Sequence, residues 1–377
     1  MKFSVHRAAF IQYLNDVQRA ISAKTALEIL SGIKLDLSED GLTMTGSNSD
    51  ISIETVISIA DEQAALNIEQ TGSVVLPARF FNEIVKKLPA ETMTLEVNER
   101  FQAAITSGSA DFTINGVDPE AYPHLPEIDS REQLTLSGDI LKQVINQTVI
   151  AASKQETRPI LTGIHLAFKE GELLAVATDS HRLSQRKLQL TGKNEADHDI
   201  IVPAQSMNEL AKMIGEESED IEIQIAENQI LFILGNTSFY SRLLEGNYPD
   251  TTRLIPQTAT TTLEVNAPEF LRAIERASLL SHEGRNNVVK LTLTSDKAML
   301  SSNSPEIGNV EEELTFTELK GDDLEISFNP DYMKDALRSF GQSEVLLSFT
   351  LPLRPFTLVP SEANGDFVQL ITPVRTI

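Results

Sequence analysis

Cysteine is missing from all 377 residues of the chain. This excludes disulfides, thiol catalysis and thiolate metal ligands, and it suits a reducing cytosol. Apolar runs of about 18 residues, the length that a membrane helix needs, are also missing. The chain starts directly with a patterned segment and has no apolar signal core. These absences predict a cytoplasmic protein without membrane contact.

The common catalytic signatures are missing as well. The chain has no Gly-x-Ser-x-Gly elbow, no phosphate-cradling Walker loop, no Gly-x-Gly-x-x-Gly fingerprint and no His-x-x-x-His pair, and its six histidines are scattered. We therefore expect no catalytic residues, no cofactor and no metal site.

Positive charge is scarce. The chain has 31 Lys and Arg against 55 Asp and Glu, a net charge of −24. Such a chain should be repelled by nucleic acid and by anionic lipid headgroups. Whether DNA is a plausible partner therefore depends on how the basic residues are distributed along the chain.

A strand end that leads through proline into an amphipathic helix occurs three times. Its prolines are Pro77, Pro203 and Pro330, which lie 126 and 127 positions apart. Proline suits a helix start because the first amide has no acceptor within the helix. The period is that of one ordinary domain and predicts three, with boundaries at 1–128, 129–256 and 257–377.

Each third repeats the same order of elements. Apolar residues at helical spacing predict a first helix, alternating residues around a turn predict a hairpin, and further alternating strands close the third. The first helices are expected at 6–24, 137–158 and 266–285, and the hairpins at 33–45, 164–176 and 289–300. The pattern predicts an α+β fold in which two helices pack on antiparallel sheets in each third.

The predicted helices differ in charge from the rest of the chain. Together they hold 15 basic and 10 acidic residues, a net +5, so all other residues total −29. A helical lining of this kind could face phosphates in a loose, salt-sensitive contact, while acidic sheets face outward. The alternative is that amphipathic helices simply happen to carry lysines. The helices counted are 6–24, 77–88, 137–158, 203–215, 266–285 and 330–340.

The segment Thr178-Asp179-Ser180-His181-Arg182-Leu183 gathers several reactive side chains. If it is a strand, adjacent residues point to opposite faces and cannot form a nucleophile, base and orienter in line. The equivalent segments at 45–50 and 301–306 lack His-Arg-Leu, which indicates a site that only the middle third has. A hydrolase built on Asp179, Ser180 and His181, or a salt-bridged surface turn, remains an alternative.

The C-terminal segment 370–377 is apolar, whereas chain ends are usually polar. It is either a last core strand or the lining of a hydrophobic groove.

Taken together, the three repeats, the Ala-Thr-Asp-x-His-Arg-Leu and Tyr-Pro-Asp segments and the Pro-x-Arg tail resemble the bacterial DNA polymerase III beta sliding clamp family over the full chain. The resemblance implies a non-enzymatic processivity factor. Two three-domain subunits would join head to tail as a homodimer and form a ring around duplex DNA. A separate clamp loader would load the ring, which would tether the DNA polymerase III catalytic subunit and other proteins with a clamp-binding motif. A repeat scaffold that never touches DNA is the rival interpretation.

The resemblance also implies a groove between the second and third domains, where an extended partner peptide would dock by apolar anchors. Many members have Gly at the position of Ser180 and Met at those of Thr372 and Val374, so a narrower and less adaptable groove is expected. The groove residues would be Leu161, Thr178, Ser180, His181, Arg182, Leu183, Pro249, Arg253, Leu254, Leu353, Pro355, Leu370, Thr372, Pro373, Val374 and Arg375.

Two further sets of residues follow from the resemblance. The DNA-binding candidates are Lys24, Arg79, Gln155, Arg158 and Arg285; an aromatic pair found in some members is replaced by Pro159 and Ile160. At the ring seam, Phe112 and Ile114 would meet Leu279 and Leu280 of the other subunit.

Overall fold

The computed structural model describes residues 1–22, 25, 27–125, 128, 133–190, 197–215, 219–281, 287–362 and 366–376. It forms two compact units, each described below by itself. The first unit is Met1–Ile140 with Glu209–Leu243, and the second is Leu141–Asn208 with Leu244–Ile377. The middle third of the sequence thus contributes to both units, and the domain boundaries at 128 and 256 stay predictions.

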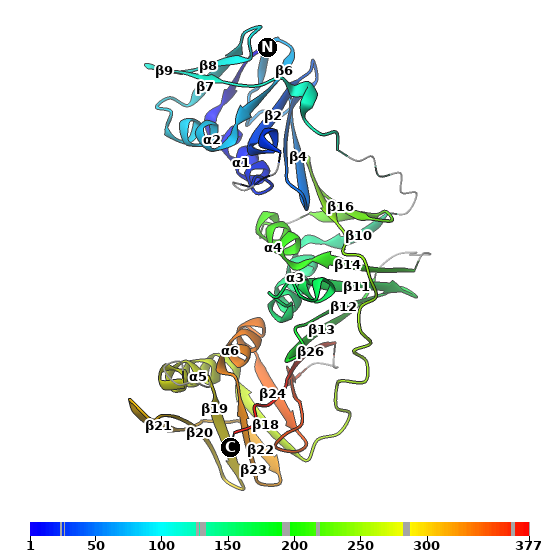
Figure 1. The fold of residues 1–377 in the computed structure, drawn as a ribbon, viewed down its shortest axis with the longest axis vertical. Helices are drawn as coiled ribbons and strands as arrows, with labels where there is room; N and C mark the ends of the chain where they lie inside the picture. Colours follow the sequence, from blue (N-terminus) through cyan, green and yellow to red (C-terminus); the bar gives the residue numbers. More distant parts are fainter. Residues whose placement is uncertain are drawn as a thin grey trace. The chain divides into compact units, whose positions relative to one another are not determined.

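The first unit contains two antiparallel sheets (Figure 1). Two helices, α1 (Arg7–Gln18) and α2 (Ala78–Lys87), bury apolar faces that meet edge to face through Phe10 and Phe81. One sheet is ordered β5 (Asn67–Gln70), β1 (Lys2–His6), β7 (Thr92–Val97), β8 (Gln102–Ser107) and β9 (Ala110–Asn115). The other is ordered β10 (Leu134–Ser137), β15 (Asp220–Ile225), β16 (Gln229–Leu234), β17 (Thr237–Arg242), β4 (Ile51–Ser58), β3 (Gly41–Ser47), β2 (Gly32–Leu37) and β6 (Gly72–Pro77).

The second unit repeats this plan with helices α5 (Ala267–Ser281) and α6 (Pro330–Ser339), which pack on each other. Its larger sheet is ordered β14 (His198–Pro203), β11 (Gly163–Lys169), β12 (Glu172–Thr178), β13 (Arg182–Gln189), β26 (Phe367–Ile371), β25 (Phe356–Pro360), β24 (Glu344–Phe349), β18 (Thr261–Asn266) and β22 (Glu318–Gly321). Its smaller sheet is ordered β21 (Gly308–Glu313), β20 (Lys297–Ser304), β19 (Val289–Thr294) and β23 (Leu324–Phe328). The helices α3 (Gly138–Thr148) and α4 (Ala204–Met213) each span a boundary between the units.

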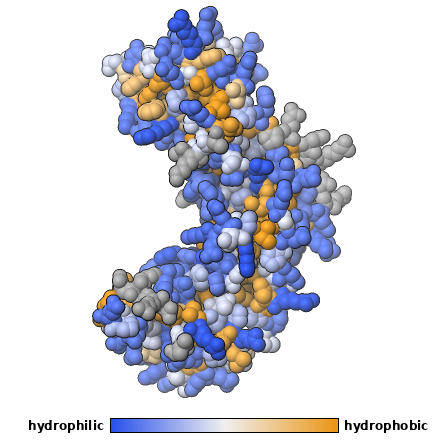
Figure 2. Space-filling view, in the orientation of Figure 1, coloured by the Kyte–Doolittle hydropathy of each residue, from blue (hydrophilic) through white to orange (hydrophobic). Residues whose placement is uncertain are grey.

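The α+β class and the three predicted hairpins are confirmed. The hairpins are β2–β3, β11–β12 and β19–β20, each paired antiparallel. The surface in Figure 2 is largely hydrophilic, with isolated apolar patches. Within the described ranges, no helix is long and apolar enough to cross a membrane.

Sheets continue from one third of the sequence into the next. In the first unit β17 of the middle third pairs with β4 of the first third. In the second unit β26 of the last third pairs with β13 of the middle third, and the two strands run side by side in Figure 1. Edge-to-edge pairing of strands therefore joins successive thirds.

The helix bounds predicted from sequence were wrong in two respects. The helices end earlier than expected, since 6–24 shortens to α1 and 137–158 to α3. Pro77 and Pro203 are the last residues of strands β6 and β14, and among these three prolines only Pro330 lies inside a helix. Pro77 has extended backbone, with φ −62° and ψ 109°, and pairs with Gly32, so the ladder holds it in the sheet.

The shorter bounds also weaken the predicted basic helical layer. The six helices as observed hold ten basic and eight acidic residues, a net +2 instead of +5. All of that excess comes from α2, with Arg79, Lys86 and Lys87 against Glu83. Arg19, Lys154 and Arg158 lie in the segments that follow α1 and α3.

Candidate functional site

The segment Asp179–His181 forms a turn between β12 and β13, which matches the alternative of a salt-bridged surface turn, since Asp179 pairs with Arg182. Asp179 Oδ1 accepts hydrogen bonds from the amides of His181 and Arg182 at 2.9 and 3.0 Å. Thr178 Oγ1 donates to the Arg182 carbonyl at 2.6 Å. Ser180 has φ +78°, a region that favours glycine. The turn is thus fixed by its own side chains.

This geometry does not support hydrolase chemistry. Asp179 Oδ2 accepts from Arg182 Nε at 2.9 Å, and Ser180 Oγ accepts from Arg158 Nη1 at 3.3 Å. Asp179 is therefore engaged with Arg182 and backbone amides instead of orienting the exposed His181 ring. Among the described residues, no group of three or more His, Cys, Asp or Glu could hold a metal ion.

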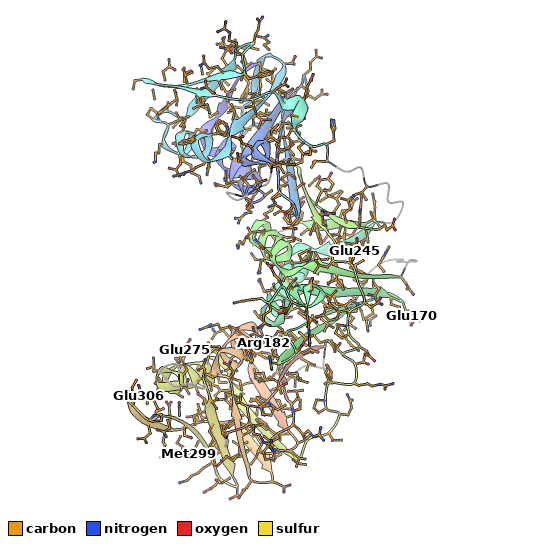
Figure 3. All side chains as sticks on the ribbon, in the orientation of Figure 1. Glu170, Arg182, Glu245, Glu275, Met299 and Glu306 are labelled. Carbon is orange, nitrogen blue, oxygen red and sulfur yellow. The ribbon has the colours of Figure 1, made fainter. Side chains whose placement is uncertain are left out.

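Arg182 connects the turn to helix α6. Its side chain is 11% exposed, Nη1 donates to Asp335 Oδ2 at 2.8 Å, and the guanidinium lies 4.5 Å from the centre of the Tyr332 ring. Burial, together with the charge of Asp179, raises the pKa of Tyr332. Figure 3 shows Arg182 where β13 approaches α6. Arg182 therefore links the 179–181 turn to α6 through Asp179 and Asp335.

Tyr248, of the Tyr-Pro-Asp segment, holds the other side of the turn. Its hydroxyl accepts from the Thr178 amide at 3.0 Å, and its ring stacks on His165 with centres 4.9 Å apart. Burial raises the pKa of Tyr248, so the hydroxyl stays protonated. In the first unit Tyr122 has a similar role, donating to the Thr45 carbonyl at 3.3 Å. The sequence pointed to the Tyr-Pro-Asp segment only through the family resemblance and did not predict this anchoring.

The C-terminal segment lies against the same turn. The Thr372 amide donates to the His181 carbonyl at 2.9 Å, and the Val374 amide donates to the Ser327 carbonyl at 2.7 Å. Residues 367–371 are the buried strand β26, whereas Thr372, Pro373 and Val374 are half-buried and Arg375 is exposed. The interpretation as a core strand is therefore confirmed for Leu370 and Ile371, and the groove lining by the residues that follow stays a prediction.

Several of the predicted groove residues form an apolar floor. Leu183 and Leu370 form a buried cluster with Val176, against which Tyr248 and Ile255 pack. Leu161 is 6% exposed.

Next to Tyr248 in the sequence, Asn247 and Pro249 contribute to an open pocket of about 460 Å³. It brings the groove candidates Leu161 and Pro249 together with Arg158, a DNA-binding candidate implied by the resemblance. Its lining is mostly apolar and consists of Arg158, Pro159, Ile160, Leu161, Asn247 and Pro249.

The remaining groove candidates also lie in the second unit. Arg253 and Leu254 are exposed and follow Pro249. Leu353 is exposed and Pro355 half-buried; they precede β25, whose Phe356 pairs with Ile371 next to Thr372.

The DNA candidates are spread over both units. Arg79 is exposed on α2 in the first unit, with its guanidinium 5.9 Å from the centre of the Phe80 ring. Gln155 and Arg158 are exposed in the second unit, in the segment after α3. Lys24 and Arg285 lie outside the described residues.

The seam candidates are apolar and accessible. Phe112 on β9 is 39% exposed and Leu279 on α5 is 70% exposed, while Ile114 and Leu280 are half-buried. Other exposed apolar side chains were not predicted from the sequence, among them Phe80 on α2 and Ile307 before β21, which are 61% and 56% exposed. Phe80 could have been found, because it neighbours Phe81 on an amphipathic helix and adjacent residues cannot both face the core.

Three repeats joined by strand edges, with an apolar floor at the last junction, are the architecture of the DNA sliding clamps. The chain belongs to the DNA polymerase III beta subunit family. Family models match its N-terminal domain at residues 1–126, its central domain at 135–250 and its C-terminal domain at 252–375.

Relatives match the chain over its whole length. Beta sliding clamps from Bacillus subtilis and Staphylococcus aureus are 47% and 48% identical, with 100% of each chain covered. The solved DNA polymerase III beta chain of Streptococcus pneumoniae has a TM-score of 0.96 at 46% identity, again with full coverage of both chains. A Pseudomonas aeruginosa sliding clamp bound to griselimycin has a TM-score of 0.92 at 25% identity and full coverage of both chains.

Proposed function

We propose that two copies of the chain close head to tail into a ring around duplex DNA in the cytoplasm, and that this ring tethers the replicative polymerase. The chain acts as a non-catalytic processivity factor. The proposal rests on two strands of the described chain, β9 and β21, each of which has one edge without a partner strand. In the repeat, these strands are equivalent to the strands whose pairing joins successive thirds of the chain.

The two edges concerned are those of β9 and β21, which are among the edge strands of the described sheets. β9 ends the five-stranded sheet and β21 ends the four-stranded sheet. By order in the repeat, β9 corresponds to β17 and β26, and β21 corresponds to β4 and β13. Exposed edges of this kind favour pairing with another chain. A second copy arranged head to tail pairs each β9 with a β21 and leaves neither edge open.

The repeat also predicts the register of the seam. The last strands of the thirds begin at Ala110, Thr237 and Phe367. Their third residues are Phe112, Phe239 and Gln369, and the latter two pair with Ile53 and Ser184. Val310 occupies the position equivalent to Ile53 and Ser184. The residue just before each of these three pairs with an equivalent position of the preceding strand. The pairs are Ser52 with Ser47, Leu183 with Thr178 and Asn309 with Asn303. Phe112 should therefore lie opposite Val310, Thr113 opposite Asn309 and Asp111 opposite Glu311.

A disulfide tests this register, since the chain has no native cysteine. Directly opposed residues of paired strands lie about 4.5–5.5 Å apart, within reach of a disulfide. Thr113→Cys combined with Asn309→Cys should give a covalent dimer on mild oxidation. The matched control, Thr113→Cys with Glu311→Cys, shifts one cysteine by two positions and should stay largely uncrosslinked. Equal crosslinking of both pairs, or of neither, would contradict the seam.

We further propose that the floor and pocket of the second unit take the partner peptide. His181 is exposed, and its carbonyl accepts from the Thr372 amide, so the turn and the C-terminal segment form one continuous surface next to the floor residues Leu183 and Leu370. His181→Ala, or removal of residues 373–377, should weaken polymerase binding and leave the dimer intact. His124→Ala, an exposed histidine in the first unit, is the control. Unchanged polymerase affinity would refute the assignment.

DNA contact is proposed for Lys24, Arg79, Gln155, Arg158 and Arg285. It should be loose, because the helices carry little net positive charge. Charge reversal at Lys24 or Arg158 should therefore slow loading onto nicked circular DNA and make it less dependent on salt, because fewer counterions are released. Normal loading by both variants would show that these residues are merely solvated.

A further inference from the structure

The two strands of the proposed seam carry only negative charge. β21 contains Glu311, Glu312 and Glu313, β9 contains Asp111, and neither strand has Lys or Arg. Arg276 forms an ion pair with Glu312. Asp111, Glu311 and Glu313 are exposed.

The two junctions within the chain lack this feature. The positions that correspond to Asp111 and Glu311 are Ser238 opposite Glu54 at one junction and Val368 opposite Gln185 at the other. Neither pair combines two charges of the same sign.

Neighbouring strands do not offset the charges at the seam. Asp111 lies opposite Thr106 on β8, and Glu311 lies opposite Ser301 on β20. In the register derived above, Asp111 and Glu311 would be directly opposed, about 5 Å apart. Like charges at that position destabilise strand pairing, and salt screens them.

We propose that the seam of this ring is held against electrostatic repulsion, so that the dimer tightens as ionic strength rises. This inference rests on the proposed ring. Salt then has opposite effects on the two interactions of the protein. It tightens the dimer contact that closes the ring, and it loosens the contact with DNA because counterions are released. The seam is then the weakest of the three strand junctions, at the place where the ring must open to admit DNA.

The test measures the dimer dissociation constant of the full chain by sedimentation, at NaCl concentrations from about 0.05 to 0.5 M, where the screening length falls severalfold. The wild-type constant should fall several-fold over this range. Asp111→Lys replaces repulsion by attraction at both seams, so its constant at low salt should be roughly tenfold lower than wild type. Its salt trend should flatten or reverse.

Asp40→Lys makes the same change of net charge at an exposed hairpin turn and should keep the wild-type behaviour. If wild type weakens with salt, or if Asp111→Lys keeps the wild-type trend, the repulsive seam is refuted while the ring survives. A chain that stays monomeric at every salt concentration, with no disulfide between Thr113→Cys and Asn309→Cys, refutes the ring and the inference together.

Discussion

Replacing Arg182 by Ala should destabilise the second unit, because it removes the side chain that ties the 179–181 turn to α6. Arg182 is 11% exposed and donates to two carboxylates, at 2.9 Å to Asp179 and 2.8 Å to Asp335. Breaking a fully buried ion pair costs about 3–5 kcal/mol. Asp335 is 38% exposed, so water compensates part of that loss. We therefore expect the free energy of unfolding of this unit to fall by about 2–3 kcal/mol.

The assay is denaturant unfolding with hydrogen exchange at the amides of β13 and α6, which reports on this unit instead of the whole chain. Arg253→Ala is the matched control, since Arg253 is an exposed arginine of the proposed groove, and it should stay within about 0.5 kcal/mol of wild type. Asp335→Asn combined with Arg182→Ala should cost less than the two single changes added together. Equal stability of the Arg182→Ala and Arg253→Ala variants would refute the assigned role.

Three further predictions concern hydrogen bonds made by hydroxyl groups. Tyr248→Phe removes the acceptor of the Thr178 amide and should weaken partner-peptide binding several-fold, measured by titration. Tyr122→Phe, the equivalent change in the first unit, should leave this binding unchanged. Equal effects of the two changes would contradict the role of Tyr248. Thr55→Val should cost about 1–2 kcal/mol, because it leaves the buried Thr237 hydroxyl unpaired, and adding Thr237→Val should recover part of that cost. Tyr13→Phe removes a 2.7 Å bond to Asp61 and should cost about 1 kcal/mol near neutral pH. Burial and this bond raise the pKa of Tyr13 to about 12, so its contribution should be complete below about pH 10 and lost as pH rises through about 12; a pH-independent difference from wild type would contradict this.

Local patterns predicted the repeats and hairpins well for a physical reason. Alternating residues and Gly or Asp turn signals act between neighbours, so 33–45 and 164–176 could be predicted to form hairpins. Helix ends were less predictable: α1 begins after His6 without a side-chain cap and ends at Gln18, although residues 19–24 still fit the apolar spacing.

The site could be predicted only in part. Which residues meet at Arg182 depends on Asp335, 153 positions away, and no local pattern indicates that pair. The Asp179–His181 turn depends on a positive φ at Ser180, which strand alternation does not predict. The groove residues came from the resemblance, and the structure adds the tyrosine anchor and the pocket beside Leu161.

Retention on DNA tests the central claim most directly. The Thr113→Cys and Asn309→Cys dimer, loaded on nicked circular DNA and then oxidised, should stay on the circle in high salt and leave quickly once the circle is cut. A topological link is insensitive to salt but needs a DNA without ends. Equal retention on circular and linear DNA, or loss of the oxidised dimer from intact circles in salt, would contradict the ring.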